Sequence, residues 1–181
     1  MEMEIRMISQ GISVTELAEK ELERLVNIYG SGLIKYCHSI LLDYHEAQDI
    51  VQGVFIKAYL KLERDCGAVI QSAWLYKSSY NMCIDVYRRR KLQQIFALRQ
   101  SEESYTESYF IDHEVNDILK QLSPKERALV YNRAVEGLDY DQLERIYGIK
   151  SATLRKRYER ARKKLIQTLN ENEIGGCQNE A

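Results

Sequence analysis

Basic residues gather near the end of the chain, at a spacing that suits a helix in contact with a nucleic acid. Arginine can pair with guanine through two hydrogen bonds, and glutamate can accept one from the amino group of cytosine. Lysine and arginine also hold phosphates, which adds affinity without reading sequence. We therefore predict that this segment enters the major groove of DNA. The residues expected to contact DNA are Ala152, Arg155, Lys156, Glu159, Arg160 and Lys163.

The segment around these residues is typical of a helix-turn-helix. Ser123 can cap a helix that has Pro124 at its first position, and Gly137 ends that helix. Asp139 can cap a short second helix, Gly148 supplies the turn, and the basic helix follows. The acidic residue in the basic helix, at position 159, indicates either base reading or an intrahelical salt bridge, and the sequence leaves both open.

Two further clusters of residues suit binding. One helix, expected to end near residue 91, combines aromatic rings with Asn81 and a run of arginines, which suits single-stranded DNA. The same rings could instead belong to the core, with the arginines on a solvated helix end. In the preceding helix, Asp49, Ile56 and Leu60 lie opposite the apolar stripe, which indicates either a docking surface or ordinary exposed aliphatic residues.

Apolar residues recur at three- and four-residue steps along the whole chain, which has a single proline, so we predict an all-α fold. The first amphipathic helix is expected over residues 16–28, with Val26 and Ile28 in its buried stripe. Gly30 and Gly32 are expected to end it, and a separate second helix to follow.

An acidic, serine-rich stretch separates the two basic blocks of the chain and predicts a flexible linker at 93–113. The fold expected is therefore two small helical domains joined by that linker, the second a helix-turn-helix. We place the domains at residues 1–92 and 114–172, and expect a disordered tail at 173–181.

Composition excludes several classes of protein. A length of 181 residues with 45% hydrophobic content suits one or two ordinary domains. The four cysteines lie far apart, so neither a zinc site nor a disulfide framework is expected. The sequence has no long apolar run, so we expect a cytoplasmic protein without a signal peptide or a transmembrane helix. The net charge of −1 hides the segregation of charge along the chain.

Three motifs, at residues 45–62, 71–91 and 122–165, occur in the order found in one known family. Together they closely resemble bacterial RNA polymerase sigma factors of the extracytoplasmic-function (ECF) group. The resemblance implies a promoter-specificity subunit that has no enzymatic activity, cofactor or metal of its own. It also implies three partners, namely core RNA polymerase through its largest and second-largest subunits, promoter DNA, and an anti-sigma protein.

The resemblance also assigns roles to the residues. The final helix would read the minus-thirty-five element, the loop from Asp65 to Gln71 would hold an extruded base, and the acidic linker would thread the polymerase active-site channel. Core polymerase would bind Asp49, Gln52, Phe55, Ile56 and Leu60. The minus-ten element would be opened and captured by Trp74, Tyr80, Asn81, Asp85, Arg88 and Arg89.

The chain departs from the family pattern at three places. Gly53 stands where a glutamate is common, which removes one polar contact and weakens the helix by up to about 1 kcal/mol. Glu144 stands where a small alanine is usual, so we expect the helix to tilt or the side chain to turn outward. Residues 77–79 are more polar than the family's, which affects minus-ten recognition.

Two other functions are compatible with parts of the sequence. A polymerase-independent helix-turn-helix regulator would bind duplex operator DNA and would need neither Trp74 nor the Ile56 stripe. A small helical hydrolase would use His38, His45 and Asp49, but no nucleophile or third metal ligand accompanies them.

Overall fold

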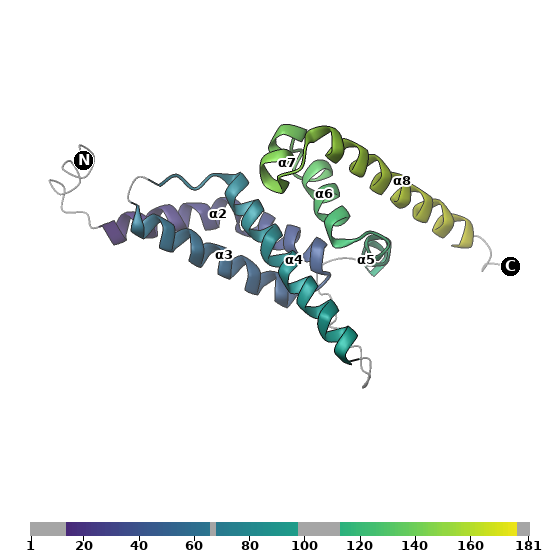
Figure 1. The fold of residues 1–181 in the computed structure, drawn as a ribbon, viewed down its shortest axis with the longest axis horizontal. Coiled ribbons are helices and arrows are strands. Elements are labelled where there is room, and N and C mark those ends of the chain that lie inside the picture. The colour runs from purple at the N-terminus through teal and green to yellow at the C-terminus, as the bar shows by residue number, and fades with distance from the viewer. Residues whose placement is uncertain (1–13, 66–67, 98–112, 177–181) are drawn as a thin grey trace.

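The described part of the chain consists of helices joined by short loops, which confirms the predicted all-α fold. A computed structural model describes residues 14–65, 68–97 and 113–176, and over these ranges it contains no strand. Figure 1 shows two groups of helices, one from each half of the chain. The helices are α2 (Val14–Leu41), α3 (Tyr44–Arg64), α4 (Ser72–Ala97), α5 (His113–Lys120), α6 (Pro124–Ala134), α7 (Tyr140–Tyr147) and α8 (Ser151–Gly176).

The first helix continues where the sequence predicts a break. α2 runs through Gly30 and Gly32, so the two helices expected there are one. A Cβ atom at Gly32 would lie 3.6 Å from the hydroxyl of Tyr76 and 3.7 Å from the carboxylate of Glu136. This glycine therefore lies where another helix and the second group come close to α2, and it does not terminate the helix.

The first group, α2 to α4, packs around the apolar faces of its three helices. Asp43 caps α3 by accepting a hydrogen bond from the Glu46 amide at 3.0 Å, as its position before the helix predicts. The buried stripe predicted for α2 is wrong at two positions, because Val26 and Ile28 are 42% and 54% exposed. Leu25, which the sequence also places in that stripe, is fully buried, because only one side of the helix faces α3 and α4.

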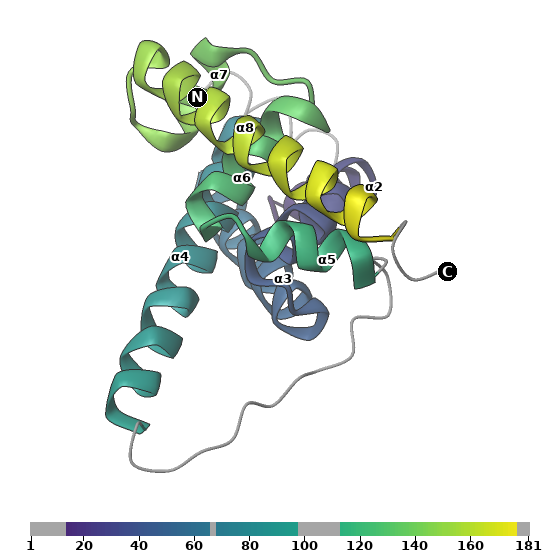
Figure 2. The ribbon, with the colours of Figure 1, turned by 90° about the vertical axis from the view of Figure 1, so that its right-hand side faces the viewer.

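The second group contains the predicted helix-turn-helix. Ser123 and Glu126 form a reciprocal capping box at the start of α6, with Pro124 in the first turn. Asp139 caps α7 by accepting a hydrogen bond from the Gln142 amide at 2.8 Å. Gly148 ends α7 with a φ of 65°, a left-handed conformation that favours glycine. In Figure 2, α8 runs along the outer side of this group, across α5 and α6.

The two groups pack directly against each other. α6 and α7 contact α2 and α4, and Figure 1 shows α6 and α7 beside α4. Ala128 and Ile146 of the second group belong to the same buried cluster as Leu33 and Leu75 of the first. The helix-turn-helix also has a smaller cluster of its own. The two predicted domains therefore share part of their core.

Helices extend into two of the segments that the sequence assigns to irregular structure. α4 continues to Ala97, beyond the predicted start of the linker, and α8 continues to Gly176, into the predicted tail. Most of the acidic linker, residues 98–112, lies outside the described residues, as do residues 177–181. No described helix is long and apolar enough to cross a membrane.

Candidate functional site

The face of α3 that lies opposite the core is exposed. Ile56 and Leu60 are 53% and 41% exposed, and Asp49 and Gln52 are also on the surface. Phe55, which the sequence adds to the same set, is buried in the core between the helices. The predicted polymerase-binding residues are therefore divided, with four on one open surface and Phe55 beneath it.

Gly53 lies on the same helix and contacts α4. A Cβ atom at this position would meet the terminal carbon of Met82 at 2.9 Å, too close without a shift of that side chain. The missing side chain therefore lets Met82 of α4 cover the backbone of α3. The glycine that replaces the family's common glutamate at position 53 therefore allows close contact between α3 and α4.

Most of the residues predicted to contact the minus-ten element lie along the open side of α4. Asn81, Asp85, Arg88 and Arg89 are exposed, and Asp85 lies 3.4 Å from Arg88, an exposed pair of little energetic weight. Trp74 is partly buried, and the ammonium of Lys61 lies 5.5 Å from its ring centroid. These five residues place aromatic, amide and charged groups along one helix at spacings that bring most of them to the same side.

Tyr80 does not share that open surface. Its ring packs edge-on against the ring of Tyr147, with 4.8 Å between the centroids. Burial raises the pKa of its hydroxyl, despite the nearby arginines 157 and 88. The structure therefore covers one predicted minus-ten residue with α7 of the other group.

The third arginine of the run on α4 has a structural role that the sequence does not reveal. Arg90 turns back to the start of α3, where it lies 2.9 Å from Asp43 and 2.6 Å from Glu46. It therefore ties α4 to the capped end of α3. The arginine run divides into two outward residues, Arg88 and Arg89, and one inward residue.

All six residues predicted to contact DNA on α8 are exposed. Leu154 and Ala161 are buried beneath them, which fixes the side of the helix that faces solvent. Over the described residues Glu159 forms no ion pair, so the intrahelical salt bridge considered from the sequence is absent. Lys164, one residue after this set, binds Glu126 of α6 at 2.7 Å.

Two residues of α7 contact the first part of α8. The guanidinium of Arg155 lies 5.1 Å from the ring centroid of Tyr140. Glu144 turns toward α8, and its carboxylate accepts a hydrogen bond from the backbone amide of Ser151 at 2.8 Å. The outward orientation expected for Glu144 thus has a specific partner, at the start of the basic helix.

A buried polar network joins the two groups of helices. The hydroxyl of Tyr147 donates to the carbonyl of Ala128 at 2.9 Å and accepts from the side-chain amide of Asn132 at 2.8 Å. It also lies 3.1 Å from the hydroxyl of Tyr36 in α2. Because the proton of Tyr147 is already used, Tyr36 is the donor in this last pair. Burial raises the pKa of both tyrosines.

A buried arginine reinforces the same junction. Arg127 of α6 donates a hydrogen bond to the carbonyl of Ile40, in the last turn of α2. The negative end of the α2 dipole favours a cation there. Burial lowers the pKa of Arg127 to about 10, which leaves it charged at neutral pH. Neither Arg127 nor Tyr147 stands out in the sequence, because each contact joins positions far apart along the chain.

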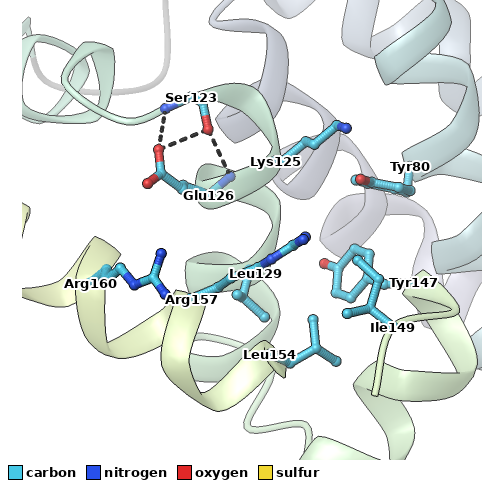
Figure 3. Close-up of a pocket in the computed structure, with 10 residues that line it drawn as sticks. All are labelled: Tyr80, Ser123, Lys125, Glu126, Leu129, Tyr147, Ile149, Leu154, Arg157 and Arg160. Carbon is cyan, nitrogen blue, oxygen red and sulfur yellow. Dashed lines mark hydrogen bonds between the residues drawn. The ribbon is translucent and has the colours of Figure 1, made fainter. Parts of the chain in front are cut away.

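A pocket of about 320 Å³ opens between α4 and the helix-turn-helix. Figure 3 shows Tyr80 and Tyr147 at one side and Arg160, from α8, at the other, with Arg157 of α8 extending between them. The floor includes the apolar side chains of Leu129, Ile149 and Leu154, and Lys125 adds a further cation. The carboxylate of Glu126 also lines the pocket, but it is paired with Lys164, so the lining suits a ligand with acidic and apolar groups together.

The residues considered for a hydrolase do not form a catalytic site. His38 is buried, and burial lowers its pKa despite the nearby Asp43. His45 and Asp49 lie on the surface of α3. Over the described residues, histidine, cysteine and carboxylate side chains form no group of three able to hold a metal ion.

Two family models match the chain, one in each group of helices. The model described as Sigma-70 region 2 matches residues 25–93, which include the exposed face of α3 and the open side of α4. The model described as Sigma-70, region 4 matches residues 112–165, which include the helix-turn-helix.

Named relatives extend the similarity over most of the chain. The ECF RNA polymerase sigma factor SigW of Bacillus subtilis is 25% identical over 162 residues, which cover 80% of this chain and 87% of SigW. The ECF RNA polymerase sigma factor SigE of Mycolicibacterium smegmatis is 25% identical over 153 residues, which cover 79% of this chain. That match spans 59% of the length of SigE.

Two solved structures share the fold. The sigma factor RpoE, in complex with the anti-sigma factor NepR from Bartonella quintana, has a TM-score of 0.67 and 22% identity over 83% of this chain and 98% of RpoE. CnrH, in complex with the cytosolic domain of CnrY, has a TM-score of 0.64 and 22% identity over 87% of this chain and 95% of CnrH.

Proposed function

The chain belongs to the extracytoplasmic-function group of sigma-70 factors, the promoter-specificity subunits of bacterial RNA polymerase, and on that premise we propose how its surfaces divide the work. The exposed face of α3 binds core polymerase. The open side of α4 captures the minus-ten element, and α8 reads the minus-thirty-five element. The chain itself performs no catalysis, since the polymerase makes the RNA, and it acts where the polymerase does, in the cytoplasm.

The exposed face of α3 is the observation that carries the proposal. Aliphatic residues normally turn inward on an amphipathic helix, yet Ile56 and Leu60 stay exposed while the opposite side of α3 fills the core. An apolar centre with the polar groups of Asp49 and Gln52 beside it is the usual anatomy of a protein interface.

The two DNA-reading surfaces suit different forms of DNA. On α4, Trp74 can stack on an unpaired base while Arg88 and Arg89 hold phosphates, a combination used for single strands. On α8, Arg155 and Arg160 project from a helix of the size that fits the major groove, where arginine selects guanine. A subunit that both locates duplex DNA and holds it open needs both surfaces.

In this structure the two groups of helices pack against each other, an arrangement that we call closed. The groups must separate before both promoter elements can be read. Elements centred near positions −10 and −35 lie about 25 base pairs apart, or about 85 Å along B-form DNA. In the closed structure, Tyr80 of α4 contacts Tyr147 of the helix-turn-helix, with ring centroids 4.8 Å apart. We propose that binding to polymerase separates the groups and uncovers Tyr80.

We also propose a protein partner that holds the chain inactive, of the class to which NepR belongs. RpoE was solved in complex with the anti-sigma factor NepR. Here, the pocket at the junction presents Lys125, Arg157 and Arg160 beside apolar side chains, which suits an acidic amphipathic segment. Because Arg160 is also a proposed base reader, a partner in this pocket would compete with DNA.

The docking proposal is tested by measuring the affinity of the chain for core polymerase. We expect Ile56→Asp to abolish binding while the helical circular dichroism spectrum and melting temperature stay unchanged, because the side chain is exposed. Val135→Asp is the matched control: Val135 is 65% exposed and is the C-cap of α6, in the other group of helices, so this variant should bind normally. Normal assembly of Ile56→Asp with polymerase would overturn the docking proposal.

A polymerase-independent regulator is the second candidate, and the family matches do not favour it. Such a protein would bind duplex DNA alone, and its binding would be indifferent to Ile56→Asp. It would also leave the exposed face of α3 unused.

A further inference from the structure

The short helix α7 presents two residues to the beginning of the basic helix. Tyr140 and Glu144 are four positions apart, so they lie on one side of α7, a single turn from each other. The ring of Tyr140 lies 5.1 Å from the guanidinium carbon of Arg155, and the Glu144 carboxylate lies 2.8 Å from the amide nitrogen of Ser151. The first two turns of α8 are therefore held by α7 at two points.

Glu144 supplies a cap that α8 does not have in its own sequence. The first amides of any helix lack a partner within the helix, and the residue before the helix often accepts one of them. Here that residue is Lys150, whose ammonium can only donate hydrogen bonds. The carboxylate of Glu144 accepts from Ser151 instead, and its negative charge suits the positive end of the helix dipole.

Tyr140 offers Arg155 a fixed surface. Its ring packs against the buried cluster of the helix-turn-helix, so the core sets its position. The guanidinium of Arg133 lies 5.3 Å from the same ring and also donates to the carbonyl of Leu138 at 3.3 Å. A cation over an exposed tyrosine ring gains about two- to fivefold in the population of the held conformation.

We propose that Tyr140 and Glu144 are positioning residues for minus-thirty-five recognition, which set the direction of Arg155 and the first turn of α8 without contacting a base. Arginine selects guanine only when its planar guanidinium meets the base edge with both hydrogen bonds aligned. A side chain already held in one orientation loses less freedom on binding. This inference rests on the proposed role of α8.

The test compares promoter preferences of holoenzymes. Each variant is assembled with core polymerase and transcribes a library randomised over the upstream element, and the transcribed templates are sequenced. The base pair whose preference disappears in Arg155→Ala defines the position that Arg155 reads. An arginine–guanine pair gives about 5- to 150-fold discrimination at such a position.

We expect Tyr140→Leu to reduce discrimination at that same position by about two- to fivefold, the range that the ring contact supplies, and Glu144→Ala to reduce it in the same direction. Preferences at the positions that other residues of α8 read should change less. Tyr140→Phe keeps the ring and Glu144→Gln keeps an acceptor oxygen, so both should retain the wild-type preference. A variant that had merely lost stability would lower transcription from all templates equally.

Two outcomes contradict the inference in different ways. If the wild-type holoenzyme selects an upstream motif but Tyr140→Leu leaves the Arg155 position unchanged, the positioning role is wrong. If the wild type selects no upstream motif at all, the proposed function of α8 fails first, and the inference fails with it.

Discussion

Removing the hydroxyl groups of Tyr36 and Tyr147 tests the closed arrangement of the two groups most directly. Tyr147→Phe removes the oxygen that accepts from Tyr36 and from Asn132, both fully buried. Leaving each of these buried donors without a partner costs about 1–3 kcal/mol. Water that enters the site can replace part of this, so we expect the free energy of unfolding to fall by about 2–4 kcal/mol. In a chain of this size that corresponds to a fall in melting temperature of roughly 4–16 °C.

Tyr36→Phe separates the contact between the groups from the network inside the second group. It leaves the bonds of Tyr147 to Ala128 and Asn132 intact and removes only the pair across the junction, at about 0.5–1.5 kcal/mol. Thermal and urea unfolding of the two single variants and the double variant form a double-mutant cycle. We expect a coupling free energy of about 0.5–1.5 kcal/mol between the two hydroxyls.

The matched control is Tyr158→Phe, which removes a hydroxyl that has no hydrogen bond among the described residues. Its free energy of unfolding should change by less than about 0.5 kcal/mol. A coupling free energy of zero between Tyr36 and Tyr147 would refute the closed junction in solution. X-ray scattering provides a second readout, since loosening the junction should increase the radius of gyration of Tyr147→Phe.

Three further perturbations test the roles assigned to single residues. Arg90→Gln removes both ion pairs to the start of α3 and should lower stability by about 1 kcal/mol, or roughly 2–4 °C in melting temperature; an unchanged melting temperature would contradict the structural role. Gly53→Ala should raise stability by up to about 1 kcal/mol in thermal unfolding, because the helix gains a better former while the flexible end of Met82 can move. A clear destabilisation would mean that Met82 cannot move. Arg160→Ala should lower transcription from the preferred promoter by about 5- to 150-fold while the affinity for core polymerase stays unchanged, and a loss of core binding would refute the division of labour between the groups.

Local sequence signals predict the helix-turn-helix well because its caps and turns depend on residues close together in the chain. Ser123 and Asp139 cap helices through residues three positions away, and Gly148 is needed for a left-handed turn. Such features are independent of what packs around them. The exposure of Ile56 follows from helical periodicity alone for the same reason.

Features that depend on distant partners are not predictable in this way. Gly32 looks like a helix end, yet it lies within α2 where Tyr76 and the second group come close. Arg90 resembles its two neighbours in sequence, and only the position of α3 distinguishes it. The contact of Arg155 with Tyr140 crosses the turn between two helices, so neither residue signals the other.

The division of promoter reading between α4 and α8 is tested most directly by reconstitution with core polymerase on a fully randomised promoter library. Sequencing the transcribed templates should show two short motifs at a fixed spacing, the downstream one weakened in Asn81→Ala and the upstream one losing its preference at one position in Arg155→Ala. Neither motif should be selected by the chain without polymerase. Two results would contradict the proposed function. One is selection of a single duplex motif by the chain without polymerase, and the other is equal transcription by core polymerase with and without the chain.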